Sequence, residues 1–128
     1  MTVDLELTGT ADAAAAARRA LDRFSGDIPD RRMRDVRLLV SELVTNAVRH
    51  AGLQVNDRIR LHARLREGVL RVEVVDPGRG FDLRPLAPDP ARASGWGLYL
   101  VEQLSDRWGM ERAAPGTRVW FEFDGSQA

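Results

Sequence analysis

The sequence predicts an α+β fold, a two-layer α/β sandwich whose mostly antiparallel, mixed sheet has helices packed on one face. Three observations predict it. Segments with alternating apolar side chains occur near the N-terminus, in the middle and near the C-terminus of the 128 residues. Longer segments with helical spacing separate them. No internal repeat or linker interrupts this order, so we expect one domain over residues 1–128.

The first half of the chain is expected to form one strand and two helices. Apolar and polar residues alternate over residues 3–7, which is typical of a short strand. An alanine-rich run over about residues 10–24 favours a helix that Thr10 or Asp12 caps. A longer helix is expected over about residues 30–51. The core-facing stripe of this helix is predicted to be Val36, Val40, Leu43, Val44 and Ala47.

The second half is expected to contain two hairpins around a loop and a helix. Residues 57–66 and 69–75 read as antiparallel strands joined by a tight turn at Glu67-Gly68. Residues 76–95 are rich in Pro and Gly and predict a long functional loop. A third helix is expected over about residues 97–106, followed by strands near Met110 and over residues 118–123 that join at Pro115-Gly116.

The alternation over residues 57–66 places four arginines and a histidine on one face of the strand. They are Arg58, Arg60, His62, Arg64 and Arg66. One interpretation is the solvated face of an antiparallel sheet. The other is a surface for a partner or for a second copy of the chain. Nucleic acid is disfavoured, because no aromatic residues are interleaved.

The composition excludes several kinds of site. Basic and acidic residues number nineteen each, so net charge gives no indication of nucleic-acid or membrane binding, and we expect neither. There is no cysteine and there are two histidines, which excludes thiolate chemistry and disfavours a zinc site. All nineteen residues counted as basic are arginines, so the chain has no lysine. A Walker-type phosphate loop needs a lysine and is therefore excluded. No apolar run is long enough to span a membrane, and the N-terminus has no signal-peptide pattern, so we expect a cytoplasmic location.

The first candidate motif is SELVTNAVRH, residues 41–50. Glu42, Asn46 and His50 are four residues apart and lie along one edge of the predicted helix, at the border of its apolar stripe. They are either surface residues with local hydrogen bonds or polar groups over a cleft. In the second case, Asn46 offers an oxygen to Mg²⁺, and Glu42 orients or deprotonates a nucleophile.

The second motif is VVDPGRGF, residues 74–81, where Asp76 ends an apolar strand and two glycines follow. It is either a plain turn or a carboxylate that accepts a hydrogen bond from a flat ligand. The third motif is SGWGLYLV, residues 94–101, where Gly95 and Gly97 open a helix. It is either a simple helix start or an anion site at the helix N-terminus. The spacing does not fit a dinucleotide-binding fingerprint.

In this order, the three motifs resemble the N, G1 and G2 boxes of the GHKL ATPase superfamily, which has the Bergerat ATP-binding fold. Gly116-Thr117 resembles the last box of that family. The resemblance covers about residues 30–123.

The resemblance implies roles for individual residues. Asn46 would coordinate Mg²⁺, and Glu42 would act as the general base. Asp76 would bind the adenine amino group of ATP with support from Thr117. The remaining positions implied to line the nucleotide site are Arg49, His50, Gly78, Gly80, Gly95, Trp96, Gly97 and Leu98.

Within the superfamily, SELVTNAVRHA, DPGRGFD and GWGLYLVEQLSD are similar to the bacterial anti-sigma-factor protein-serine kinases. We expect neither a phosphoacceptor-histidine hairpin nor a transducer domain. The resemblance implies a homodimeric kinase that sequesters a sigma factor and phosphorylates a serine of a STAS-type antagonist. Trp96 departs from many relatives, and any lid cation would have to come from Arg84 or Arg92.

Two alternatives remain. The chain could be a non-catalytic module that uses ATP only to fix its conformation. It could also be a histidine-kinase catalytic domain that acts in trans.

Overall fold

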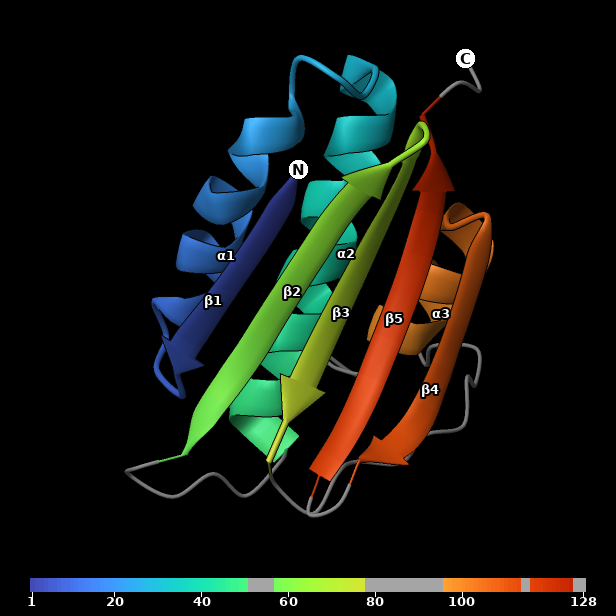
Figure 1. The fold of residues 1–128 in the computed structure, drawn as a ribbon. Coiled ribbons are helices and arrows are strands. Elements are labelled where there is room, and N and C mark those ends of the chain that lie inside the picture. The colour runs from blue at the N-terminus through green and yellow to red at the C-terminus, as the bar shows by residue number, and fades with distance from the viewer. Residues whose placement is uncertain (51–56, 78–95, 114–115, 126–128) are drawn as a thin grey trace.

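Nine elements form two layers in the computed structural model, which describes residues 1–50, 57–77, 96–113 and 116–125 (Figure 1). Five of the elements are strands, three are α-helices, and one is a 3₁₀ turn. In chain order they are β1 (Thr2–Thr8), α1 (Ala13–Leu21), the 3₁₀ turn (Asp22–Phe24), α2 (Asp30–His50), β2 (Arg58–Arg66), β3 (Val69–Asp76), α3 (Trp96–Leu104), β4 (Arg107–Ala113) and β5 (Gly116–Asp124).

The strands form one sheet in the order β1-β2-β3-β5-β4. All four pairings of these strands are antiparallel, so the described strands contain no parallel pair of the kind that a mixed sheet would have. The three helices lie on one face of the sheet (Figure 1). The predicted α+β sandwich is therefore confirmed.

The core lies between the sheet and α2. The whole predicted stripe of α2 is buried, with Val36, Val40 and Val44 fully inaccessible. The inward residues of the central hairpin, among them Ile59 and Leu61, are equally buried. Removal of this apolar surface from water is the main source of stability for a chain of this size.

Local details differ from the sequence-based expectation at α1. This helix begins at Ala13, which agrees with Asp12 and not with Thr10 as its cap, because a turn comes first: Thr10 N–H bonds to Thr8 O at 2.8 Å and Ala13 N–H bonds to Thr10 O at 3.1 Å. Asp12 occupies the N-cap position, but its side chain makes no capping hydrogen bond. The predicted turn at Glu67-Gly68 is confirmed, with φ of 53° and 79°, as expected for a two-residue hairpin loop.

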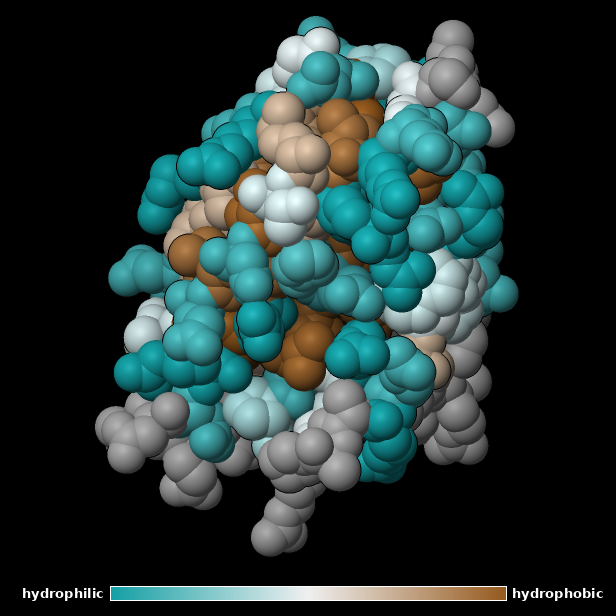
Figure 2. Space-filling model, viewed as in Figure 1, coloured by the Kyte–Doolittle hydropathy of each residue, from teal (hydrophilic) through white to brown (hydrophobic). Residues whose placement is uncertain are grey.

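The opposite face of the sheet is open and hydrophilic over most of its area (Figure 2). Its charged side chains pair with one another across the strands. Arg60 makes two hydrogen bonds to Asp4, at 3.1 and 2.9 Å. Arg71 bonds to Glu122 at 3.2 Å, and its guanidinium carbon lies 4.1 Å from the ring centre of Trp120. Among the described residues, no helix is long and apolar enough to cross a membrane.

Candidate functional site

The candidate site lies at the end of the sheet where β3 stops and β5 starts, which is the lower end in Figure 1. The C-terminal end of α2 lies behind the same end of the sheet. Helix α2 packs against β3, β5 and α3. The fold therefore brings parts of three predicted motifs to one end of the molecule.

Two polar residues face each other there in neighbouring strands. Asp76, the last residue of β3, is paired in register with Thr117, the second residue of β5. Both point into the helix-covered face, and their exposed fractions are 3% and 0%. A carboxylate and a hydroxyl are rarely buried side by side without a structural or a binding role.

The hydroxyl of Thr117 is the more informative of the two. Its Oγ1 is buried and has no hydrogen-bond partner within the described ranges. Buried Nε atoms of Arg32 and Arg118 share that state, but each of those guanidinium groups bonds through another nitrogen. The Thr117 hydroxyl is the only polar atom of its side chain. Burial without a partner costs about 1–3 kcal/mol, so a ligand that bonds here recovers that cost.

Gly116 lets the two strands approach closely enough to create this pair. A Cβ at position 116 would stand 1.6 Å from the carbonyl oxygen of Asp76 and 2.8 Å from the Cα of Pro77. Both contacts are to backbone, which cannot rotate away. Glycine is therefore required at this position by the close approach of β5 to the end of β3.

The polar residues of α2 lie on the border of its buried stripe. Asn46 is 8% exposed, and Glu42, one turn earlier, is half-buried. Arg49 is exposed. Asn46 and Glu42 thus lie at the border of the buried stripe, as predicted for them, whereas the side chain of His50, the third residue of the predicted edge, lies outside the described part of the structure.

The structure does not describe the side chains of several predicted site residues. Gly78, Gly80 and Gly95 lie outside the described residues, as do Arg84 and Arg92. His50 ends α2, and Trp96, Gly97 and Leu98 form the start of α3, but the structure describes only their backbone. The predicted helix after the loop is confirmed, with its start at Trp96.

The arrangement fits a planar ligand that has an amino group, such as a purine. The Asp76 carboxylate accepts hydrogen bonds, the Thr117 hydroxyl can donate or accept one, and Gly116 leaves the strand ends without side-chain bulk. Among the described residues, no cluster of three His, Cys, Asp or Glu side chains is placed to hold a metal ion. One amide oxygen, that of Asn46, is compatible with Mg²⁺, which keeps most of its waters and uses few protein ligands.

Comparison with known protein families decides the assignment. The model of the histidine kinase-like ATPase domain matches residues 7–123, which is nearly the whole chain. The chain belongs to the histidine kinase-like ATPase domain family. Membership of this ATPase family implies that the chain binds ATP.

Curated relatives point to one branch of this ATPase family. The chain is 33% identical over 85 residues to the serine-protein kinase RsbW of Staphylococcus aureus (strain MRSA252), covering 56% of this chain and 54% of that protein. It is 34% identical over 84 residues to the serine-protein kinase RsbW of Listeria innocua, with the same coverage. The chain thus spans about half the length of the curated relatives it matches.

Solved structures share the fold of this ATPase domain. The RsbU and RsbW domains of Rv1364c from Mycobacterium tuberculosis match 96% of this chain and 32% of that chain, with a TM-score of 0.74 and 24% identity. The histidine kinase domain of the blue-light activated kinase EL346 from Erythrobacter litoralis matches 89% of this chain and 61% of that chain, with a TM-score of 0.65 and 26% identity.

Gly116 is the residue of this site whose role sequence reasoning did not assign. The sequence predicts a turn between strands at Pro115-Gly116, because such pairs usually mark turns. In the structure Gly116 is the first residue of β5, opposite Ala113 of β4. The signal in the sequence was the glycine next to Thr117, but only the approach of β5 to Asp76 gives it a reason.

Proposed function

We propose that this chain is an ATP-dependent protein-serine kinase domain of the anti-sigma type. It phosphorylates a serine of a STAS-type antagonist, sequesters a sigma factor, acts as a homodimer in the cytoplasm, and forms one domain over residues 1–128. The observation that carries the proposal is the buried Asp76–Thr117 pair with its unpartnered hydroxyl. The family match and the similarity to serine-protein kinases support it.

Each site residue has a role in this proposal. Asp76 accepts a hydrogen bond from the adenine amino group, and Thr117 supports that contact. Backbone amides at the start of α3, near Gly95 and Gly97, bind the phosphates, as helix N-termini favour anions. Gly78 and Gly80 shape the pocket. The lining is completed by Arg49, His50, Trp96 and Leu98.

The chemistry rests on positioning and charge. Mg·ATP supplies the phosphoryl group together with a cation that neutralises it. Asn46 offers its side-chain oxygen to that cation. Glu42, half-buried one turn earlier on α2, accepts the proton of the acceptor serine.

Phosphoserine formation tests the proposal. The chain is incubated with Mg·ATP and a panel of STAS-domain proteins, and phosphoserine is detected by mass spectrometry. Glu42→Ala is expected to reduce the rate about 100-fold or more, because a general base contributes on that order, while ATP binding measured by calorimetry stays within about threefold. Glu73→Ala is the matched control, since Glu73 is a carboxylate on the open face of the sheet that pairs with Arg71.

Two other outcomes identify the alternatives. Intact ATP binding without phosphoserine on any acceptor would identify a non-catalytic module. An acid-labile phosphohistidine product would identify a histidine-kinase domain acting in trans. Either result contradicts the serine-kinase proposal and leaves the ATP site in place.

A further inference from the structure

The open face of the sheet carries two arginines that its charge network does not use. Arg64 and Arg66 lie on β2, and both side chains are exposed. Neither of them forms a hydrogen bond or an ion pair with any residue in the described ranges. Other arginines of the same face do have carboxylate partners, and these are Arg60, Arg71, Arg107 and Arg118. The two remaining cations therefore need a separate account.

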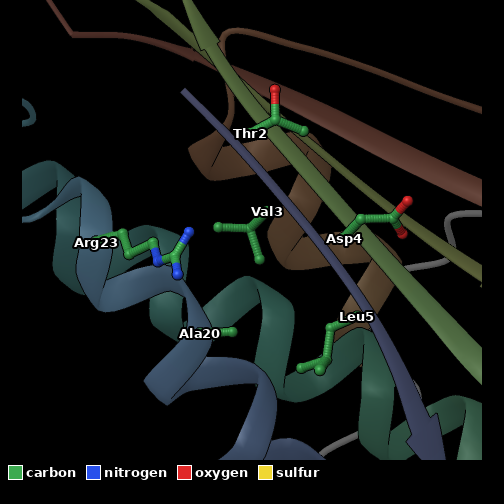
Figure 3. A pocket seen from close by; sticks show the side chains of 6 residues that line it. All are labelled: Thr2, Val3, Asp4, Leu5, Ala20 and Arg23. Atoms are coloured by element: carbon green, nitrogen blue, oxygen red, sulfur yellow. The ribbon is translucent and has the colours of Figure 1, made fainter.

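The neighbours of Arg64 offer it no carboxylate. In register it is paired with Thr2 of β1 and with Arg71 of β3. Figure 3 shows the Thr2 side chain pointing away from Ala20 of α1, so Thr2 shares the open face with Arg64. Like charges that lie directly opposite each other in an antiparallel pair are destabilising. Arg64 thus occupies a position where the sheet alone gains nothing from a positive charge.

The side chains around this position leave its charge unshared. Arg71 bonds to Glu122 of β5 at 3.2 Å, and β5 lies on the side of β3 away from β2. Arg66 is paired in register with Val69, a half-buried apolar residue. The surface at Arg64 and Arg66 therefore combines two available guanidinium groups with one apolar side chain.

A partner cannot reach β2 through main-chain pairing. This strand lies between β1 and β3 (Figure 1), so its N–H and C=O groups are bonded in the plane of the sheet. A segment that docks on the face of the sheet must satisfy its own main chain, as a helix does. Residues two apart in a strand are separated by about 7 Å, and residues four apart in a helix by about 6 Å. One helix can therefore direct two carboxylates at the two arginines.

We propose that the open face at Arg64 and Arg66 binds a helix of a partner protein that carries Glu or Asp residues four apart. The two carboxylates pair with the two guanidinium groups, and small side chains between them pack over Val69. Opposite charges orient the encounter and exclude partners of the wrong sign. Because this surface lies on the face of the sheet opposite the helices, the interaction does not rest on the proposed kinase activity.

The described helices of a second copy do not supply this pattern. Helix α1 has no acidic residue, and α3 has Glu102 alone. The acidic residues of α2 are five or more positions apart, namely Asp30, Asp35 and Glu42. Four carboxylates of the open face already pair with arginines of their own chain, and these are Asp4, Glu73, Glu111 and Glu122. A partner with an acidic helix is the occupant that the charges favour.

An acidic helical peptide tests the proposal on the full chain without nucleotide. The fluorescein-labelled probe consists of five Glu-Ala-Ala-Ala repeats, and circular dichroism checks its helicity. Binding is followed by fluorescence anisotropy up to about 1 mM peptide at low salt. We expect saturable binding that the double variant Arg64→Gln, Arg66→Gln weakens about three- to tenfold. The matched control is Arg31→Gln, Arg34→Gln, which removes two exposed arginines of α2 and should leave binding within about twofold.

Further measurements separate a docked helix from general attraction between charges. In a second peptide of the same composition, every second glutamate is moved by two residues, so that no two glutamates are three or four apart. This peptide should bind at least about threefold more weakly. The charge-reversed variant Arg64→Glu, Arg66→Glu should instead bind the peptide that has Lys in place of Glu. Arg64→Gln alone should leave the midpoint of urea denaturation unchanged or higher, since it removes the like charge opposite Arg71.

Several results would overturn the proposal. They include no saturable binding, equal binding of the two acidic peptides, and equal losses in the two double variants. A lowered urea midpoint for Arg64→Gln would assign Arg64 to the stability of the fold instead. A dimer that sedimentation shows to dissociate in the Arg64→Gln, Arg66→Gln variant would make a second copy the occupant. None of these results depends on ATP, so a failure here is distinct from a failure of the kinase proposal.

Discussion

The two ends of the sheet each carry an aspartate, but their surroundings differ. At the upper end in Figure 1, Asp106 is bonded by the Arg32 guanidinium and by the Asp124 N–H at 2.6 Å. Arg32 also lies over the Phe123 ring, 4.9 Å from its centre. Nearby, Gly125 N–H bonds to Gly68 O at 2.7 Å. The upper end is thus tied together by the chain itself.

The lower end has a different character. Asp76 is buried opposite Thr117, whose hydroxyl has no partner in the described part of the chain. The strands meet there through a glycine that no other residue could replace without moving backbone. The comparison contrasts a carboxylate whose partners the protein supplies with a buried threonine hydroxyl that has none among the described residues, and that hydroxyl is where we propose that a ligand binds.

The largest expected effect comes from adding a methyl group at Gly116, at the lower end of the sheet. Gly116→Ala places a Cβ 1.6 Å from the Asp76 carbonyl oxygen, so the strands must move apart. We expect a loss of about 2–4 kcal/mol in the free energy of unfolding, measured by urea denaturation, and loss of ATP binding. At Gly26, nothing lies within 4 Å of an added Cβ, so Gly26→Ala should change stability by less than about 1 kcal/mol.

The next effect concerns the upper end and its dependence on pH. The hydrogen bond from Arg32, with that from the Asp124 N–H, lowers the pKa of Asp106 below its usual value. A lowered folded-state pKa gives stability that is present above about pH 4 and is lost as the pH falls through the folded-state value. Asp106→Asn should cost about 1–3 kcal/mol at pH 7, and the gap to the wild type should close in acid.

Urea denaturation of both proteins between pH 7 and pH 2 measures this gap. Glu122, whose pKa is lowered first by Arg107 and then by Arg71, remains in both proteins and serves as an internal reference. A gap that stays constant with pH would show that Asp106 acts through shape rather than charge.

A smaller effect, of unusual sign, is expected at Thr117. Thr117→Val keeps the shape and removes the unpartnered hydroxyl. The free chain should become more stable by about 1 kcal/mol, while ATP should bind about three- to tenfold more weakly. Thermal unfolding with and without ATP measures both. Thr8→Val, an exposed control, should change neither, and a destabilised T117V chain would count against the assignment of this hydroxyl to a ligand.

The smallest effect is expected on the open face. Arg71→Ala removes ion pairs with Glu73 and Glu122 and the contact with Trp120. These groups are partly solvated, so we expect a loss of about 0.5–1 kcal/mol and unchanged ATP affinity. A change in ATP affinity would show that the two faces of the sheet are coupled.

The sequence was sufficient to predict the helices and strands whose apolar spacing is regular. The stripe of α2 and the alternation of β2 are set by local periodicity, and both were confirmed. For α1 the sequence leaves Thr10 and Asp12 open as the cap, since alanines favour helix without fixing its first turn, and the structure has Asp12 at the N-cap position.

The contacts between distant segments could not be predicted in the same way. That β5 inserts between β3 and β4, and so places Thr117 opposite Asp76, depends on sheet order rather than on any local pattern. The same holds for Arg32 and Asp106, which are 74 residues apart. The chemistry of the site residues stays a prediction from the sequence, whereas the reason for Gly116 appears only in the structure.

Calorimetric titration with ATP of two matched variants tests the central claim most directly. Asp76→Asn and Asp106→Asn make the same chemical change at opposite ends of the sheet, and circular dichroism checks that each variant is folded. We predict that D106N binds Mg·ATP as the wild type does, whereas D76N binds at least about tenfold more weakly. Equal ATP binding by D76N and the wild type would contradict the assignment of the lower end as the nucleotide site.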